Sequence, residues 1–115
     1  AVTMKGAEGA GKIAKMMDDL RNNTPSKIGD WTVLEARDYK KDECVNMVTG
    51  DKHSTGLPDS NVLYYDLSDN AWCCARPSGT EPKIKFYMGV KGSSIEDAVA
   101  KEEALKKAVM ELVGQ

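Results

Sequence analysis

One stretch of the sequence constrains the fold more than any other, because apolar and other side chains alternate along it. It runs through Lys83, Ile84, Lys85, Phe86, Tyr87, Met88, Gly89 and Val90. Successive side chains of a β-strand point to opposite faces, so this period of two predicts a strand over residues 83–90. The chain must therefore contain a β-sheet, and its other segments have to be compatible with one.

Four further segments have strand character, and two have helical character. The additional strands are expected at residues 31–39, 44–49, 61–67 and 71–76. A polar turn at residues 68–70 predicts a hairpin between the last two of these. Apolar residues at helical spacing predict helices over residues 7–22 and 94–113. Helices at both ends of a run of strands favour the α+β class. We expect an antiparallel sheet of four to five strands with two helices packed on one face.

Each predicted helix has an apolar side that should pack against the sheet. In the first helix this side consists of Ile13, Met16, Met17 and Leu20. In the second it consists of Ile95, Ala98, Val99, Leu105, Ala108, Val109 and Leu112. A capping box formed by Ser93 with Glu96, or by Ser94 with Asp97, would mark the start of the second helix.

Length, charge and cysteine content narrow the class of protein. The 115 residues suit one compact domain, expected over residues 1–115. Sixteen basic and eighteen acidic side chains give a net charge of −2, which argues against nucleic acid as a partner. No apolar run is long enough for a membrane span. Cys73 and Cys74 are adjacent, so on a strand they would face opposite sides. We therefore expect reduced thiols, no metal site, and a cytoplasmic location.

The segment Arg76-Pro77-Ser78-Gly79-Thr80-Glu81-Pro82 lies between two predicted strands and has a composition suited to binding phosphate. The Arg76 guanidinium offers a planar fork of donors that matches two phosphate oxygens. Ser78 and Thr80 add hydroxyl donors. Gly79 removes a side chain where backbone N–H groups have to approach an anion.

Two charged residues in and beside the loop would act on a phosphate in opposite ways. Lys83 follows at once and would raise the local potential, while a carboxylate at Glu81 would repel phosphate. Glu81 is therefore expected to point away and to hold either the loop or a basic side chain. Proline, serine and glycine are also favoured in ordinary tight turns, so composition alone leaves a plain turn open as the alternative.

The loop and the segments around it resemble the sequences of a known family. RPSGTEPKIKFY, at residues 76–87, resembles the phosphate-binding signature of the α-phosphohexomutase superfamily, which includes phosphoglucomutases, phosphomannomutases and phosphoglucosamine mutases. GDWTVLEARDY, TGLPDSNVLYYDL and KIKFYMGVKGSS are similar to the larger glucose-phosphate and pentose-phosphate mutases. The resemblance therefore covers nearly the whole chain and is greatest to the phosphoglucomutases.

The resemblance implies that the chain is the fourth, C-terminal domain of a four-domain enzyme, with a fold similar to the TATA-binding-protein-like class. It implies that Arg76, Ser78, Gly79 and Thr80 hold the phosphate of a hexose phosphate that is not being transferred. Segments that resemble the family's phosphoserine loop and magnesium site are absent from this sequence. The nucleophile, Mg²⁺ and sugar recognition are therefore expected on the other three domains, and the isolated domain should be inactive.

Other functions remain open from the sequence alone. The domain could belong to a mutase acting on mannose, glucosamine or pentose phosphates, or it could be a free-standing phosphate-binding module. Trp31 and Trp72 could stack against a sugar ring, although packing within the fold is the favoured interpretation of both.

Overall fold

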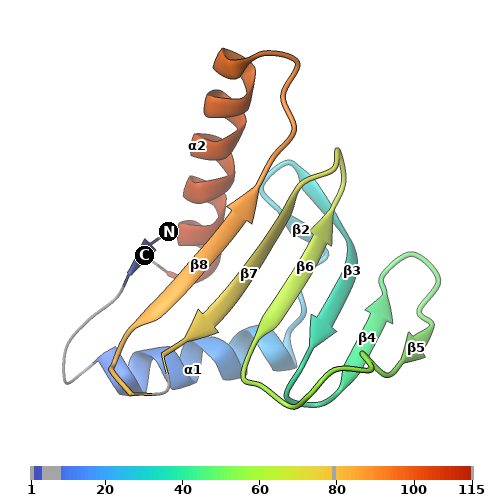
Figure 1. The fold of residues 1–115 in the computed structure, drawn as a ribbon, viewed down its shortest axis with the longest axis vertical. Coiled ribbons are helices and arrows are strands. Elements are labelled where there is room, and N and C mark those ends of the chain that lie inside the picture. The colour runs from blue at the N-terminus through green and yellow to red at the C-terminus, as the bar shows by residue number, and fades with distance from the viewer. Residues whose placement is uncertain (1, 4–8, 79, 115) are drawn as a thin grey trace.

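The computed structural model describes residues 2–3, 9–78 and 80–114. The chain forms β1 (Val2–Thr3), α1 (Gly9–Asn22), β2 (Lys27–Ile28), β3 (Trp31–Asp38), β4 (Glu43–Asn46), β5 (Lys52–His53), β6 (Leu63–Leu67), β7 (Trp72–Pro77), β8 (Ile84–Gly89) and α2 (Ile95–Leu112). The predicted α+β class is confirmed, and each of the five predicted strands is present as β3, β4, β6, β7 or β8 (Figure 1).

The strands form an antiparallel sheet with the order β1-β8-β7-β6-β3-β4-β5, and β2 pairs with the start of β3. The sheet is wider than predicted, because β1, β2 and β5 were not expected. Each of these three strands has only two residues, which is too short to show an alternation of side chains. The middle of the sheet consists of β3, β6, β7 and β8. Five residue pairs join β3 to β6, four join β6 to β7 and six join β7 to β8.

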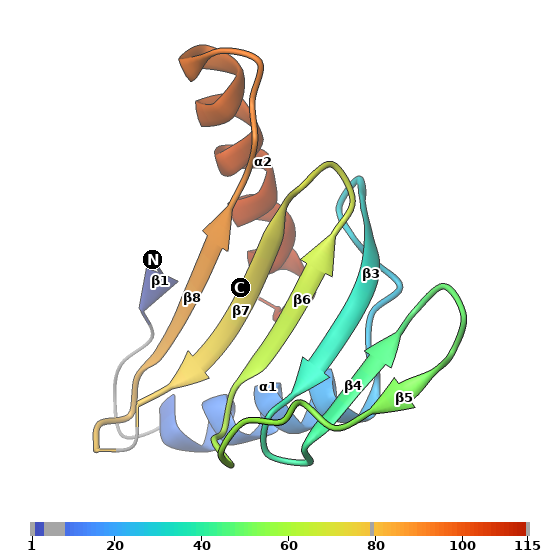
Figure 2. The same ribbon diagram turned by 45° about the vertical axis from the view of Figure 1, so that its right-hand side comes forward.

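Both helices pack on the same face of the sheet, as predicted (Figures 1 and 2). We call this the covered face, and the other the open face. On the covered face the strands contribute a continuous apolar layer made of Val33, Ala36, Leu63, Tyr65, Leu67, Cys73, Ala75, Ile84 and Phe86. Residues between these along each strand are mostly half-buried or exposed and lie on the open face.

The two helices contribute unequally to the core. All four predicted apolar residues of α1 are buried: Ile13, Met16, Met17 and Leu20. In α2 only Leu105 and Val109 are fully buried among the residues that the structure describes. The prediction that Ile95 and Val99 pack against the sheet was wrong, since they are 85% and 55% exposed. The reason is geometric, because the first part of α2 extends past the ends of the strands (Figure 2).

The start of α2 nevertheless has the predicted cap. Ser94 has an extended backbone, and its hydroxyl oxygen accepts a hydrogen bond from the Asp97 backbone N–H at 3.1 Å. Ser93 donates its own backbone N–H to the Asp97 carboxylate at 2.8 Å. A helix start that is satisfied in this way needs no tertiary support for its first turn, which explains how α2 can begin beyond the sheet.

Candidate anion-binding site

The predicted phosphate loop joins the two strands β7 and β8 at one end of the sheet (Figure 1). Six residue pairs hold these strands in register, from Trp72 opposite Gly89 to Pro77 opposite Ile84. In this register Arg76 lies directly opposite Lys85. Both are exposed and alternate with the buried residues of their strands, so both side chains lie on the open face.

Several hydrogen bonds connect the described residues of the loop to one another. The Ser78 backbone N–H donates to the Lys83 carbonyl at 2.8 Å, and the Lys83 N–H donates to the Glu81 carbonyl at 2.7 Å. The Ser78 hydroxyl oxygen accepts longer bonds from the backbone N–H groups of Thr80 and Glu81, at 3.3 and 3.2 Å. The Ser78 hydroxyl can still donate its own proton, because it accepts in both of these bonds.

A surface depression of about 400 Å³ lies beside this loop. It is lined by Arg76, Pro77, Ser78, Glu81, Lys83, Lys85 and Tyr87. Three of these side chains are cationic and one is a carboxylate, so the depression has a net positive charge at neutral pH. Its volume falls within the range of about 300–1,000 Å³ that is usual for small-molecule sites. The depression could therefore accept an anion with an organic group attached.

Glu81 lies differently from our expectation in one respect. As expected, it holds a basic side chain, because its Oε2 lies 2.5 Å from Lys83 Nζ. It does not point away from the site, however, since it is among the residues that line the depression. The ion pair explains why this carboxylate can be present there. It neutralises part of the Lys83 charge and leaves Arg76 and Lys85 as the dominant cations.

The structure brings most of the predicted site residues together and adds two. Arg76, Ser78, Glu81 and Lys83 all line the depression. Thr80 is exposed and is not among the described lining residues, and Gly79 lies outside the described residues. Lys85 and Tyr87 were missed by sequence reasoning. The period-two pattern placed both on one face of their strand, but only the hairpin register shows that this face is shared with Arg76.

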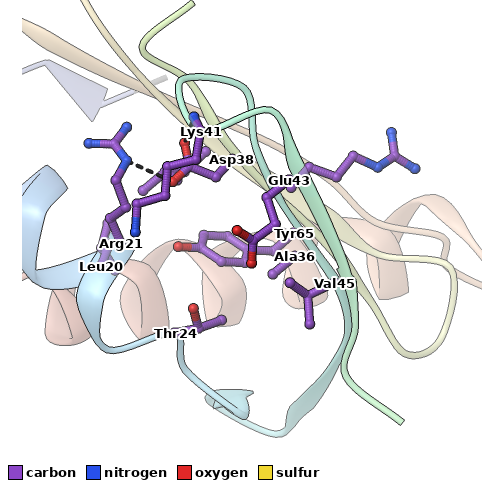
Figure 3. A pocket seen from close by; sticks show the side chains of 11 residues that line it. Leu20, Arg21, Thr24, Ala36, Asp38, Lys41, Glu43, Val45 and Tyr65 are labelled. Atoms are coloured by element: carbon purple, nitrogen blue, oxygen red, sulfur yellow. Dashed lines mark hydrogen bonds and ion pairs between the residues drawn. The ribbon is translucent and has the colours of Figure 1, made fainter. Parts of the chain in front are cut away.

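A second, much smaller hollow lies where α1 meets the ends of β3 and β4 (Figure 3). Arg21 Nε donates to Asp38 Oδ2 at 2.8 Å beside it, and these side chains are only 7% and 13% exposed. The buried Tyr65 hydroxyl faces this hollow and has no hydrogen-bond partner among the described residues. With a volume of about 50 Å³ the hollow is too small for a sugar phosphate, so it belongs to the joint between α1 and the sheet.

The three thiols are free, and two of them lie in the core. Burial, with a smaller contribution from the adjacent Cys74, raises the pKa of Cys73 to about 12. Burial and a hydrogen bond to Glu35 raise the pKa of Cys44 to about 11. Cys73 lies on the covered face and Cys74 is half-buried on the open face, as their adjacency predicted. Neither pKa is lowered, so these residues have none of the features of a reactive thiolate.

The part of the chain that the structure describes contains neither a cluster of metal ligands nor a membrane-spanning helix. No group of three His, Cys, Asp or Glu side chains in that part of the chain could hold a metal ion. None of its helices combines the length and the apolar character needed to cross a membrane.

Comparison with known proteins decides which family this arrangement resembles. The phosphoglucomutase of Staphylococcus saprophyticus subsp. saprophyticus is 35% identical over 104 residues, which are 90% of this chain and 19% of that protein. Phosphoglucomutases of Staphylococcus aureus strains MSSA476 and MW2 are each 35% identical over 103 residues, covering 90% of this chain and 18% of theirs. Over nearly its whole length the chain is therefore similar to one segment of a phosphoglucomutase.

The predicted resemblance to these enzymes is thus confirmed, and the chain spans about a fifth of the length of the curated relatives that it matches. This share is consistent with one domain of a larger enzyme. No family model matches the chain, and no solved structure matches it either. The finer expectation of a TATA-binding-protein-like fold therefore stays a prediction, as does the extent of the domain over residues 1–115.

Proposed function

We propose that this chain is the C-terminal, substrate-phosphate-binding domain of a phosphoglucomutase that interconverts glucose 1-phosphate and glucose 6-phosphate through a bisphosphate intermediate. The observation that supports this most strongly is the cationic depression at the loop between β7 and β8. It lies in a chain that is 35% identical to phosphoglucomutases over 90% of its length. Phosphate is the group that the depression would bind.

Each residue of the depression would make a different contact with a bound phosphate. Arg76 would contribute a two-pronged set of donors, and Lys85, opposite it in the sheet, would add a second charge from the neighbouring strand. The Ser78 hydroxyl would donate its free proton. Thr80 and Gly79 would offer further donors. Because the loop is already closed by its own hydrogen bonds, little conformational entropy would be lost on binding.

The role of such a clamp follows from the reaction. A sugar bisphosphate that has to present each of its ends in turn needs a second place for the end that is not reacting. The loop would hold that idle phosphate and so position the opposite end of the sugar at the nucleophile. Phosphoryl transfer itself would take place on the other three domains, together with Mg²⁺ and the phosphoserine. The clamp would supply binding energy away from the reacting atoms.

The proposal is tested by titrating the 115-residue chain with glucose 6-phosphate and following backbone amide shifts by NMR. We expect the shifts to concentrate at Ser78, Thr80 and Lys85, with a Kd near or above about 1 mM because the loop faces bulk water. Arg76→Ala should abolish them. Lys107→Ala, which removes an exposed charge from α2, is the matched control and should leave them unchanged.

Two results would contradict the proposal. Shifts centred on α2 and not on the loop would remove the depression from the binding site. A micromolar Kd for the chain alone would favour a free-standing phosphate-binding module, because such a module has to work without partner domains.

A further inference from the structure

We infer that Tyr87 contacts the organic part of the ligand and makes the depression selective for a phosphorylated sugar ring over free phosphate. This inference rests on the proposed phosphate clamp and extends it along the sheet. Its starting point is the register of the hairpin. Arg76 pairs with Lys85, and the next pair on the same face is Cys74 with Tyr87. Tyr87 therefore lies one step further from the loop than the two cations, on the open face.

The spacing suits a ring attached to a phosphate. Residues two apart on an antiparallel strand are about 7 Å apart, which is comparable to the width of a six-membered sugar ring. A phosphate held between Arg76 and Lys85 would leave room for its sugar over Tyr87. The depression has a volume of about 400 Å³, which is far more than an inorganic phosphate needs, and Tyr87 forms part of its wall.

Other aromatic side chains of the open face are already engaged with one another. The rings of Tyr64 and Trp72 stack with centroids 5.6 Å apart, and the Arg37 guanidinium lies 4.9 Å from the Tyr64 ring. Trp72 also covers Gly89, where a Cβ atom would come within 2.2 Å of the indole nitrogen. Trp72 thus packs within the fold, and so does Trp31, which is buried. Neither is placed to stack on a sugar in the depression.

Tyr87 differs from these residues because no described residue stacks on its ring. The described residues give it neither a ring partner nor a side-chain hydrogen bond, and it is 38% exposed. An aromatic side chain of this kind can pack against the C–H groups of a sugar ring, while its hydroxyl exchanges hydrogen bonds with sugar hydroxyls. Free phosphate has no apolar surface and would gain nothing from this contact.

The test compares two ligands on the same 115-residue chain. Dissociation constants for inorganic phosphate and for glucose 6-phosphate are measured from amide shifts for the unaltered chain, Tyr87→Ala, Tyr87→Phe and Leu34→Ala. Tyr87→Ala should weaken binding of glucose 6-phosphate by roughly three- to tenfold, as expected for losing some 30–50 Å² of apolar contact. Its Kd for inorganic phosphate should not change. Tyr87→Phe should keep most of the preference.

Leu34→Ala is the matched control, because Leu34 is 39% exposed and lies on β3, away from the depression. It should alter neither dissociation constant, and the amide spectrum of each variant establishes that it is folded. If Tyr87→Ala weakens both ligands equally, or neither, the inference about Tyr87 is wrong while the clamp stands. If the unaltered chain binds neither ligand, the clamp itself is contradicted, and the inference about Tyr87 with it.

Discussion

The covered face and the open face of the sheet are made by alternate residues of the same strands, yet their side chains have opposite character. Ile84 has no exposed surface and Phe86 only 3%, and both lie under the helices. Lys85 lies between these two residues on the strand, and Tyr87 follows Phe86. Both are exposed and line the depression. On β7 the buried Ala75 is next to the exposed Arg76 in the same way. The two faces therefore have different roles. The covered face stabilises the domain, and the open face can bind a ligand.

This separation makes the two faces independently testable. A substitution on the covered face should change the free energy of unfolding, and one on the open face near the loop should change binding. Neighbouring residues of one strand provide matched pairs, because they share backbone environment and differ in the face on which they lie.

The largest effect is expected from Ile84→Ala on the covered face. Removing a fully buried Ile side chain leaves a cavity, so the free energy of unfolding should fall by about 2–5 kcal/mol. Lys85→Ala, on the adjacent residue of the open face, should change it by less than about 0.5 kcal/mol. Urea denaturation of both variants measures the difference. Equal losses for the two residues would mean that the open face is also covered.

The next largest effect is expected from Arg76→Ala, and it should appear in function and not in stability. An exposed arginine at the end of β7 contributes little to the core, so the unfolding midpoint should stay unchanged. In the complete enzyme, losing a charge-assisted contact worth about 1.5–3 kcal/mol should lower kcat/KM by roughly 10- to 150-fold. Coupled kinetics with glucose 1-phosphate measure this, and unimpaired kinetics would remove Arg76 from the site.

A smaller effect is expected from pH, and Cys73 on the covered face should contribute to it together with Cys44. Burial raises the pKa of Cys73 from 9.0 to about 12, so the folded state keeps the proton while the unfolded state releases it. The Cys73 contribution to the free energy of unfolding should therefore fall as the pH rises above about 9, by about 1 kcal/mol at pH 10. Urea titrations at pH 7 and pH 10 measure the loss. Cys73→Val should reduce it, and an unchanged loss in this variant would assign it to other groups.

The smallest effect is expected from Tyr65→Phe. The Tyr65 hydroxyl is buried and has no hydrogen-bond partner among the described residues. Removing this hydroxyl therefore breaks no hydrogen bond to them. The free energy of unfolding should change by less than about 1 kcal/mol. Tyr65→Ala, which removes the buried ring as well, should cost about as much as Ile84→Ala. If the two variants lose similar stability, the hydroxyl and not the ring is what the covered face requires.

The same comparison explains how much could be predicted from the sequence. Periodicity identified the long strands and both helices. A buried face requires apolar residues at a regular spacing, and this spacing is visible in the order of residues along the sequence. It could not identify strands of two residues, such as β5. It also could not show that Ile95 lies beyond the sheet. A helical repeat indicates which side of a helix is apolar and says nothing about what covers that side.

Some residues of the candidate site could be predicted from the sequence and others could not. Arg76, Ser78 and Lys83 were found because they belong to one contiguous segment whose chemistry suits an anion. Lys85 and Tyr87 join them through the pairing of β7 with β8, which depends on register. The sequence shows alternation within a strand but not which residues of two strands are opposite each other. Expecting a tight hairpin at residues 76–83 would have been the signal that finds both.

That hairpin also has a consequence for how the domain folds. The two strands that position the candidate site are neighbours along the chain and are joined only by the loop at their end. β-Hairpins of this kind form in about 1–10 μs, whereas pairing β3 with β6 has to close a longer loop of chain. The pairing that brings Arg76 opposite Lys85 is therefore a local one, which requires only a short loop to close. Their alignment is set locally, before slower long-range pairing completes the sheet around them.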